Sequence, residues 1–329
     1  MPGDADTIGP FLARAGWAAA RRAPLAGDAS HRRYDRLTRD GETAVLMIAP
    51  PETGEDTRPF LRIAQHLGAV ELSAPEILAA EPETGLLLLE DLGDALIARI
   101  ADDPEKEHAL YAAAVDVLVH LHRHPVPEGV AAMDAARLCD LAALPWTTYC
   151  PGDPAGMIAA LGALLSETSG LTDILALRDY HAENLIWLPE RTGPARVGLL
   201  DFQDAVAGHR AYDLVSLLED ARRDVAPDLR EAMIDRYLTA TGTAPAPFRR
   251  ACAVLGVQRH LRILGIFARL CVRDGKPGYL RFMPRVWSHL ARDLAHPDLA
   301  ELQAVVLADL PAPDAAVLTE LEARCAPTR

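Results

Sequence analysis

Three polar side chains between residues 177 and 204 have the types and the order that phosphoryl transfer requires. Asp179 is followed five positions later by Asn184, and Asp201 stands at the end of an apolar run. In transfer from a nucleotide, one carboxylate accepts the proton of the acceptor hydroxyl, while an amide and a second carboxylate hold Mg²⁺ against the phosphates. Asp and Asn also favour turns, so each residue alone has a structural explanation. The three in this order favour Asp179 as the base and Asn184 and Asp201 as metal ligands.

A buried hairpin is expected to position these side chains. The apolar runs at 185–188 and 197–200 are too short for helices, and residues 190–195 between them contain Gly and Pro. Such a hairpin fixes the polar groups at its ends on one rim, which is the rigid support that a metal and phosphate site needs.

Two further polar residues accompany the proposed base. His181, two positions after it, either hydrogen-bonds the acceptor or braces the loop. Asp213, after a turn, is interpreted as structural: it caps the next helix and fixes the catalytic loop.

The phosphate side is expected at residues 27–34, which read GDASHRRY. Ser30 and backbone N–H groups can cup phosphate oxygens, and His31, Arg32 and Arg33 supply positive charge. The stretch has one glycine where a kinase glycine-rich loop has three, and an ordinary polar hairpin explains it equally well.

The strand at 45–48 lacks the phosphate-pairing lysine of protein kinases. Met47 or a neighbour stands in its place, and the lysines of the chain, Lys106 and Lys276, lie elsewhere. Either Arg32 or Arg33 supplies the missing charge, or the protein is a degraded kinase that binds nucleotide without catalysis.

Residues 86–93, LLLLEDLG, are interpreted as the linker between two lobes. Backbone groups near Glu90 and Leu92 can meet an adenine edge while leucines sandwich the ring.

The whole chain predicts an α+β fold with two lobes. It has 329 residues, 50% of them hydrophobic, enough for one large core or two modest ones. Residues 1–91 predict a small mixed nucleotide-binding lobe, and residues 92–329 a larger, mostly helical lobe that carries the catalytic hairpin and the acceptor pocket. The expected strands are 23–26, 33–37, 43–49, 76–80 and 86–90, around a helix at 59–67.

Composition argues against several partners. The formal net charge is -14, and no basic run alternates with aromatic residues, which argues against nucleic acid and anionic membranes. No apolar run of membrane-spanning length and no signal peptide is evident, so we expect a cytoplasmic protein with no obligate protein partner. The five cysteines are odd in number and widely spaced, which predicts reduced thiols.

Five motifs resemble the aminoglycoside phosphotransferase superfamily in order and spacing. They are LEDLG at 89–93, HLHR at 120–123, DYHAEN at 179–184, LLDFQDA at 199–205 and AYDL at 211–214. The resemblance implies a bilobal, protein-kinase-like fold that uses ATP and Mg²⁺.

A narrower resemblance is to bacterial kinases that phosphorylate the anomeric hydroxyl of the cell-wall amino sugars N-acetylmuramate and N-acetylglucosamine. It rests on GDASHRRYDRL at 27–37, APP at 49–51, HLRILGIFARL at 260–270 and DGKPGYLRFMPRVW at 274–287. That family is similar in lacking the lysine, which argues against a degraded kinase.

The resemblance also implies roles for residues around the acceptor. It assigns Asp179, Asn184 and Asp201 as above, and implies that Gln203 and Asp204 face the sugar pocket. Arg259 and Arg262, one helical turn apart, either meet the lactyl carboxylate of N-acetylmuramate or form salt bridges.

Two alternatives remain open. A kinase of the same fold that acts on an aminoglycoside, choline or another amine would suit the acidic charge. A pseudokinase that binds nucleotide and regulates a partner would need no acceptor.

Overall fold

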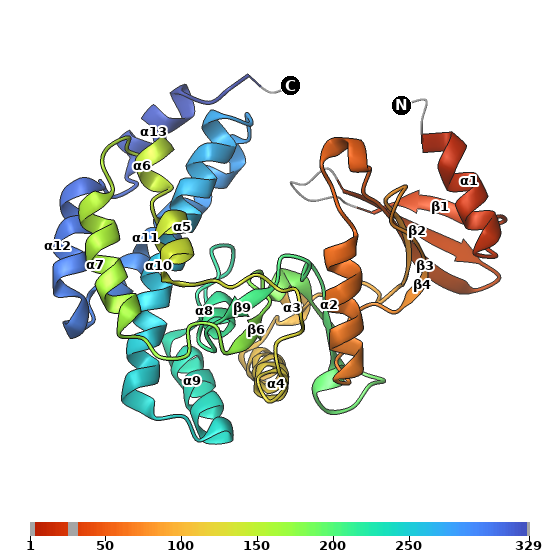
Figure 1. Ribbon diagram of the computed structural model, residues 1–329, viewed down its shortest axis with the longest axis horizontal. Helices are drawn as coiled ribbons and strands as arrows, with labels where there is room; N and C mark the ends of the chain where they lie inside the picture. Colours follow the sequence, from red (N-terminus) through yellow and green to blue (C-terminus); the bar gives the residue numbers. More distant parts are fainter. Residues whose placement is uncertain (1–3, 26–31, 328–329) are drawn as a thin grey trace. The chain divides into compact units, whose positions relative to one another are not determined.

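The computed structural model describes residues 4–25 and 32–327, which form two compact units (Figure 1). The first comprises Met1–Val117 and Glu183–Ala205, and the second Leu118–Ala182 and Val206–Arg329. A mixed sheet region with a mostly helical remainder confirms the predicted α+β class. The lobe boundary near Leu92 stays a prediction, because the first unit includes residues on both sides of it.

The first unit is built on an antiparallel sheet in the order β1-β2-β3-β5-β4. Its strands are β1 (Arg21–Pro24), β2 (Arg33–Arg39), β3 (Glu42–Ile48), β4 (Ile77–Glu81) and β5 (Leu86–Glu90). Asp40 and Gly41 join β2 to β3 with positive φ angles of 49° and 84°. Both central residues of a tight hairpin turn need such angles, so the Asp-Gly pair fixes the β2–β3 register.

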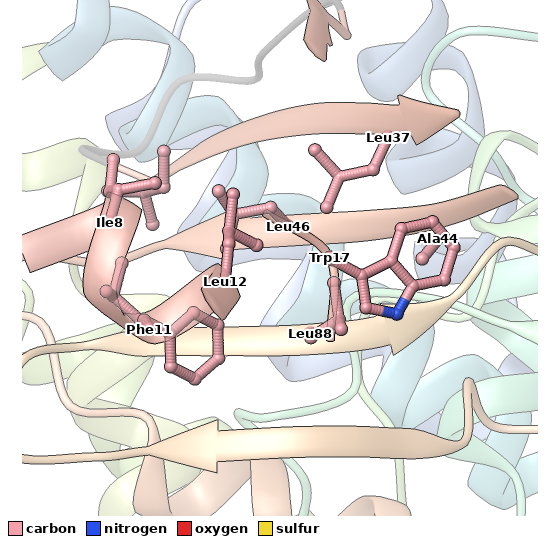
Figure 2. Packing of buried hydrophobic residues seen from close by; sticks show 10 residues of the cluster. Ile8, Phe11, Leu12, Trp17, Leu37, Ala44, Leu46 and Leu88 are labelled. Atoms are coloured by element: carbon pink, nitrogen blue, oxygen red, sulfur yellow. The ribbon is translucent and has the colours of Figure 1, made fainter. Parts of the chain in front are cut away.

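One face of this sheet is covered by α1 (Asp4–Arg14) (Figure 1). Ile8, Phe11 and Leu12 of the helix, with Trp17 after it, pack on strand residues (Figure 2). The strand residues of this cluster are Leu37, Ala44, Leu46, Ile48, Leu86 and Leu88. Because side chains alternate along a strand, residues such as Val45 point to the opposite face. That face carries the cavity described below.

The expected hairpin is present in the first unit as β7 (Leu185–Trp187) and β8 (Val197–Leu199). The Leu199 N–H donates to the Ser73 carbonyl over 2.8 Å, and Ile186 forms a bridge with Leu96. A Cβ at Gly198 would lie 2.9 Å from Leu92 Cδ1, so this part of β8 packs closely against the Leu92 side chain. The hairpin is thereby fixed to the segments before β4 and α3 (Ile97–Ile100).

Helices dominate the second unit. Their bounds are α5 (Ala135–Ala142), α6 (Pro145–Thr148), α7 (Ala155–Ser166), α8 (Tyr212–Leu218), α9 (Pro227–Thr241), α10 (Pro245–Val272), α11 (Met283–Leu294), α12 (Ala300–Asp309) and α13 (Ala315–Ala323). In the first unit α2 spans Arg58–Ala69, and α4 (Pro104–Leu121) runs from one unit into the other. Helices α5 and α6 are separate because Pro145 cannot donate the backbone hydrogen bond that would continue α5.

Helix α10 is the central element of the second unit. A Cβ at Gly265 would lie 2.4 Å from Leu144 Cβ, so the glycine lets α10 approach the start of α6. In the described part of the chain, α10 alone is long and apolar enough to cross a membrane, whereas the sequence predicted no such stretch. Its apolar window is 89% buried inside the protein, which is the environment of a core helix.

A two-stranded ladder of β6 (Ile174–Ala176) and β9 (Val206–Gly208) was not predicted. Strands of this length are too short to show a periodic pattern. The ladder matters because the stretch with Asp179 follows β6 directly.

A disulfide joins Cys271 at the end of α10 to Cys325 after α13, so the prediction of reduced thiols is wrong for this pair. The chain brings the two together because the Ala326 N–H donates to the Cys271 carbonyl over 3.3 Å. The two cysteines are separated by 54 positions, so their spacing could not reveal the contact. Cys139, Cys150 and Cys252 are free thiols.

The half-buried His122 makes the stability of the protein depend on pH. Its Nδ1 lies 2.8 Å from the Tyr237 hydroxyl, and burial lowers its pKa to about 3. Below about pH 6.5 His122 becomes protonated in the unfolded chain but stays neutral in the folded chain. The contribution of His122 to stability is therefore lost as pH falls from about 6.5 towards 3. At pH 5 this loss is roughly 2 kcal/mol.

We therefore expect His122→Asn to destabilise the protein less at pH 5 than at pH 7. The two losses in the free energy of unfolding should differ by roughly 2 kcal/mol. Urea unfolding at the two pH values measures it. The matched control is His108→Asn at an exposed position of α4, with little expected effect at either pH. Equal destabilisation by His122→Asn at both pH values would contradict the conclusion that His122 stays neutral in the folded protein.

Candidate active site

A cavity of about 860 Å³ lies in the first unit, between the sheet, the linker after β5 and the ends of the β7–β8 hairpin. Its size is that of a site for a nucleotide-sized ligand. It brings together many of the residues that the sequence singled out. These are Arg32, Glu90, Leu92, Asn184, Asp201, Gln203 and Asp204.

One end of the cavity is formed by the linker. Leu89, Glu90, Leu92 and Gly93 line it, with Leu92 only 9% exposed. The Glu90 N–H donates to the Glu76 carbonyl over 2.9 Å, and its carboxylate pairs with Arg191. The linker therefore presents apolar side chains beside backbone that is held in place.

Sequence reasoning missed an ion-pair cluster at this end. Arg36 contacts Asp91 at 2.7 Å and Asp94 at 2.8 Å, and all three residues line the cavity. The two carboxylates raise the pKa of Arg36, while the guanidinium lowers the pKa of Asp94. One guanidinium is thus shared by two carboxylates, and the three residues hold one another in place.

The other end of the cavity contains Arg32, Tyr34, Glu55 and Asp201. Arg32 Nε donates to Glu55 Oε2 over 2.7 Å. Burial raises the pKa of the Tyr34 hydroxyl to about 12, although Arg32 lowers it. Arg33 is exposed and is not among the lining residues. Ser30 and His31, also predicted to bind phosphate, lie outside the described residues.

Asn184 and Asp201 lie at the two ends of the hairpin and both line the cavity. The Leu200 N–H donates to the Asn184 carbonyl over 3.0 Å, and Gln203 Nε2 donates to Asp201 Oδ1 over 2.7 Å. Asp201 has a left-handed φ of 55°, and the buried ring of Phe202 behind it stacks on Phe60 at 4.8 Å between centroids. A carboxylate and an amide oxygen are the hard ligands that Mg²⁺ prefers, so this donor set fits that ion.

The proposed base, Asp179, lies in the second unit, in a stretch whose backbone is hydrogen-bonded by residues of α8. Asp213, 1% exposed, accepts the Leu177 N–H at 2.6 Å and the Arg178 N–H at 2.8 Å. Arg178 has a left-handed φ of 72°, which is unfavourable outside glycine and persists only when its surroundings enforce it. The Ser216 hydroxyl, 3.2 Å away, donates to the Arg178 carbonyl. The backbone N–H and carbonyl of Arg178, immediately before Asp179, are therefore both hydrogen-bonded.

Asp213 fixes the loop as predicted, but the helix cap differs. Ala211 is the N-cap residue of α8, without a side-chain bond, because the Asp213 carboxylate is turned to the loop. Burial raises the pKa of Asp213 to about 6, and its bonds with the two N–H groups lower it.

The remaining predicted acceptor residues also lie in the second unit. His181 is 6% exposed, its Nε2 is 3.3 Å from Arg222 Nη1, and burial lowers its pKa. Arg259 is 5% exposed and its Nη2 donates to Ser216 Oγ over 2.6 Å. Its guanidinium also interacts electrostatically with Asp179.

Arg262 differs from Arg259 in its surroundings. It is half-buried, and its Nη1 lies 3.4 Å from the Tyr212 hydroxyl. The two arginines, equivalent in the sequence, therefore contact different parts of α8.

Comparisons with known proteins identify the family of the chain. The model of the phosphotransferase enzyme family matches residues 21–250. The N-acetylmuramate/N-acetylglucosamine kinase of Caulobacter vibrioides is 40% identical, covering 89% of this chain and 93% of its own. The kinase of the same name from Pseudomonas aeruginosa is 34% identical, covering 88% of each chain.

An ADP-bound aminoglycoside phosphotransferase has a similar fold, with a TM-score of 0.58 and 16% identity over 91% of this chain and 99% of that one. This likeness confirms the predicted kinase-like fold. The length and identity of the matches leave no doubt about kinship: the chain belongs to the phosphotransferase enzyme family, together with the N-acetylmuramate/N-acetylglucosamine kinases.

Proposed function

We propose that the protein is an ATP-dependent kinase that phosphorylates the anomeric hydroxyl of N-acetylmuramate and N-acetylglucosamine. The observation that carries the proposal is the 40% identity, over 89% of the chain, to a kinase named for both sugars. The substrates are small molecules, and with ATP as donor we place the reaction in the cytoplasm.

The nucleotide occupies the cavity of the first unit. Its adenine lies against Leu89, Leu92 and the linker backbone, and its phosphates point to the end that holds Asn184 and Asp201. These two side chains would hold Mg²⁺, which neutralises charge on the phosphates when bound. The related structure with ADP supports a nucleotide of this kind.

Asp179 acts as the base toward the acceptor. Its carboxylate takes the proton of the anomeric hydroxyl as that oxygen forms a bond to the γ-phosphorus. The bond from the γ-phosphorus to the β–γ bridging oxygen breaks, and the electron pair leaves with ADP. Asp213 and Ser216 hold the preceding residue, so the carboxylate needs no reorganisation when the proton moves.

The other predicted acceptor residues have distinct proposed roles. His181 braces the loop, since it is buried and contacts Arg222. Gln203 and Asp204, which line the cavity beside Asp201, face the sugar. Arg259 and Arg262 provide the positive charge that a lactyl carboxylate requires.

A transfer assay with ATP tests the proposal. The acceptors are N-acetylmuramate, N-acetylglucosamine, kanamycin and choline, at equal concentrations, with ADP release as the readout. We expect transfer to the two amino sugars and none to kanamycin or choline. Transfer only to kanamycin or choline would replace the acceptor assignment, and ATP binding without any transfer would favour a pseudokinase.

A further inference from the structure

The nucleotide cavity has no lysine to pair with phosphate. Val45 of β3 lines the cavity, and Met47, two residues on and fully buried, shares its face. Of the two lysines in the sequence, Lys106 lies in α4 with Asp102 at 3.1 Å, and Lys276 belongs to the second unit. In a site of this kind a cationic side chain pairs with the phosphate groups. Without a lysine, another side chain must supply that positive charge.

The arginines that line the cavity are Arg32, Arg36 and Arg99. Arg36 is held by Asp91 and Asp94 at the linker end, and Arg99 also interacts electrostatically with Asp94. Both arginines therefore interact with acidic residues at the linker end of the cavity, whereas the metal ligands Asn184 and Asp201 lie at the other end.

Arg32 alone of the three interacts with the metal-ligand end. Its guanidinium acts electrostatically on Asp201 and Tyr34, and it pairs with Glu55, which also lines the cavity. Arg32 immediately precedes β2 and continues the two-residue alternation of that strand. Tyr34 and Arg36 share its face, whereas Arg33 lies on the face of Leu37, which packs in the α1 core.

Glu55 gives the Arg32 side chain a defined orientation. The Nε to Oε2 distance is 2.7 Å, and the side chains are 13% and 15% exposed. An ion pair so shielded from water is screened less than a surface pair. The guanidinium also hydrogen-bonds the Tyr34 side chain, and its planar array of N–H donors matches the oxygens of a phosphate group.

We propose that Arg32, oriented by Glu55, replaces the missing lysine and binds the phosphate groups of the nucleotide at the Asp201 end of the cavity. The inference rests on the proposed function, because it presupposes that the cavity takes ATP. It also assigns Glu55 as a positioning residue, in the manner of the acidic partner that holds a kinase lysine.

Calorimetric binding of ATP, ADP and adenosine to the full chain tests the inference. For Arg32→Met we expect Kd for ATP and ADP to rise about 10- to 100-fold, the size of one lost charge-assisted contact, and Kd for adenosine to change less than about twofold. Arg32→Lys should recover part of the loss. The control is Arg33→Met, the same substitution one residue on at an exposed position, with all three Kd values unchanged.

Glu55→Gln is the test of the positioning role. It should weaken ATP binding less than Arg32→Met does, and it should add little loss when combined with that variant. Retained adenosine binding shows that each variant is folded. ATP bound equally by wild type and Arg32→Met would overturn the inference alone. A wild-type protein that binds neither ATP nor adenosine would overturn the nucleotide site and the inference with it.

Discussion

Asp179→Asn is expected to lower kcat about 10³-fold while leaving the Kd for ATP within about twofold of wild type. The asparagine keeps the size of the side chain but cannot accept the proton of the sugar hydroxyl. Nucleotide binding is spared because the residues proposed for it lie in the first unit, and Asp179 belongs to the second. Steady-state rates and calorimetry measure the two quantities.

The control for this substitution is Asp228→Asn, at an exposed position in the first turn of α9. It removes one carboxylate from the same unit and should leave both quantities unchanged. Turnover of Asp179→Asn within tenfold of wild type would show that another group accepts the proton.

The second large effect is expected at Asp213. Its replacement by alanine leaves the N–H groups of Leu177 and Arg178 without the acceptor they now share. A buried donor without a partner costs about 1–3 kcal/mol, so we expect a loss of about 2–4 kcal/mol in the free energy of unfolding. The burial cost of the carboxylate, visible in its pKa of about 6, offsets part of the loss.

Activity distinguishes positioning from mere stability. In folded Asp213→Ala we expect kcat to fall about 10- to 100-fold with little change in the Kd for ATP, because the left-handed Arg178 residue is no longer held. Asp213→Asn keeps one acceptor oxygen and should lie between alanine and wild type. An alanine variant with normal kcat below its unfolding transition would refute the positioning role.

Much of the site was predictable because its residues follow local rules. The short apolar runs and the Gly-Pro segment predicted the β7–β8 hairpin, and the Asp40-Gly41 pair is typical of a tight turn such as that between β2 and β3. Asn184 and Asp201 consequently line one cavity, as the order of the residues suggested.

What the sequence did not reveal depends on tertiary contacts. The Arg36–Asp91–Asp94 cluster joins residues more than 50 positions apart, and neither partner shows a local signal. The Cys271–Cys325 disulfide and the β6–β9 ladder also join segments that are distant in the sequence and show no local signal. One signal was available, however. The period of two, extended by one residue before β2, places Arg32 on the same face as Tyr34 and Arg36 and places Arg33 on the opposite face.

The most direct test of the account is the position of phosphate in the product. The protein is incubated with ATP, Mg²⁺ and N-acetylglucosamine labelled with ¹³C at the anomeric carbon, and the product is examined by ³¹P and ¹³C NMR. We predict a phosphorus coupling at the labelled carbon, which only a phosphate on the anomeric oxygen produces. A phosphorylated sugar without this coupling, or no phosphorylated sugar at all, would contradict the account.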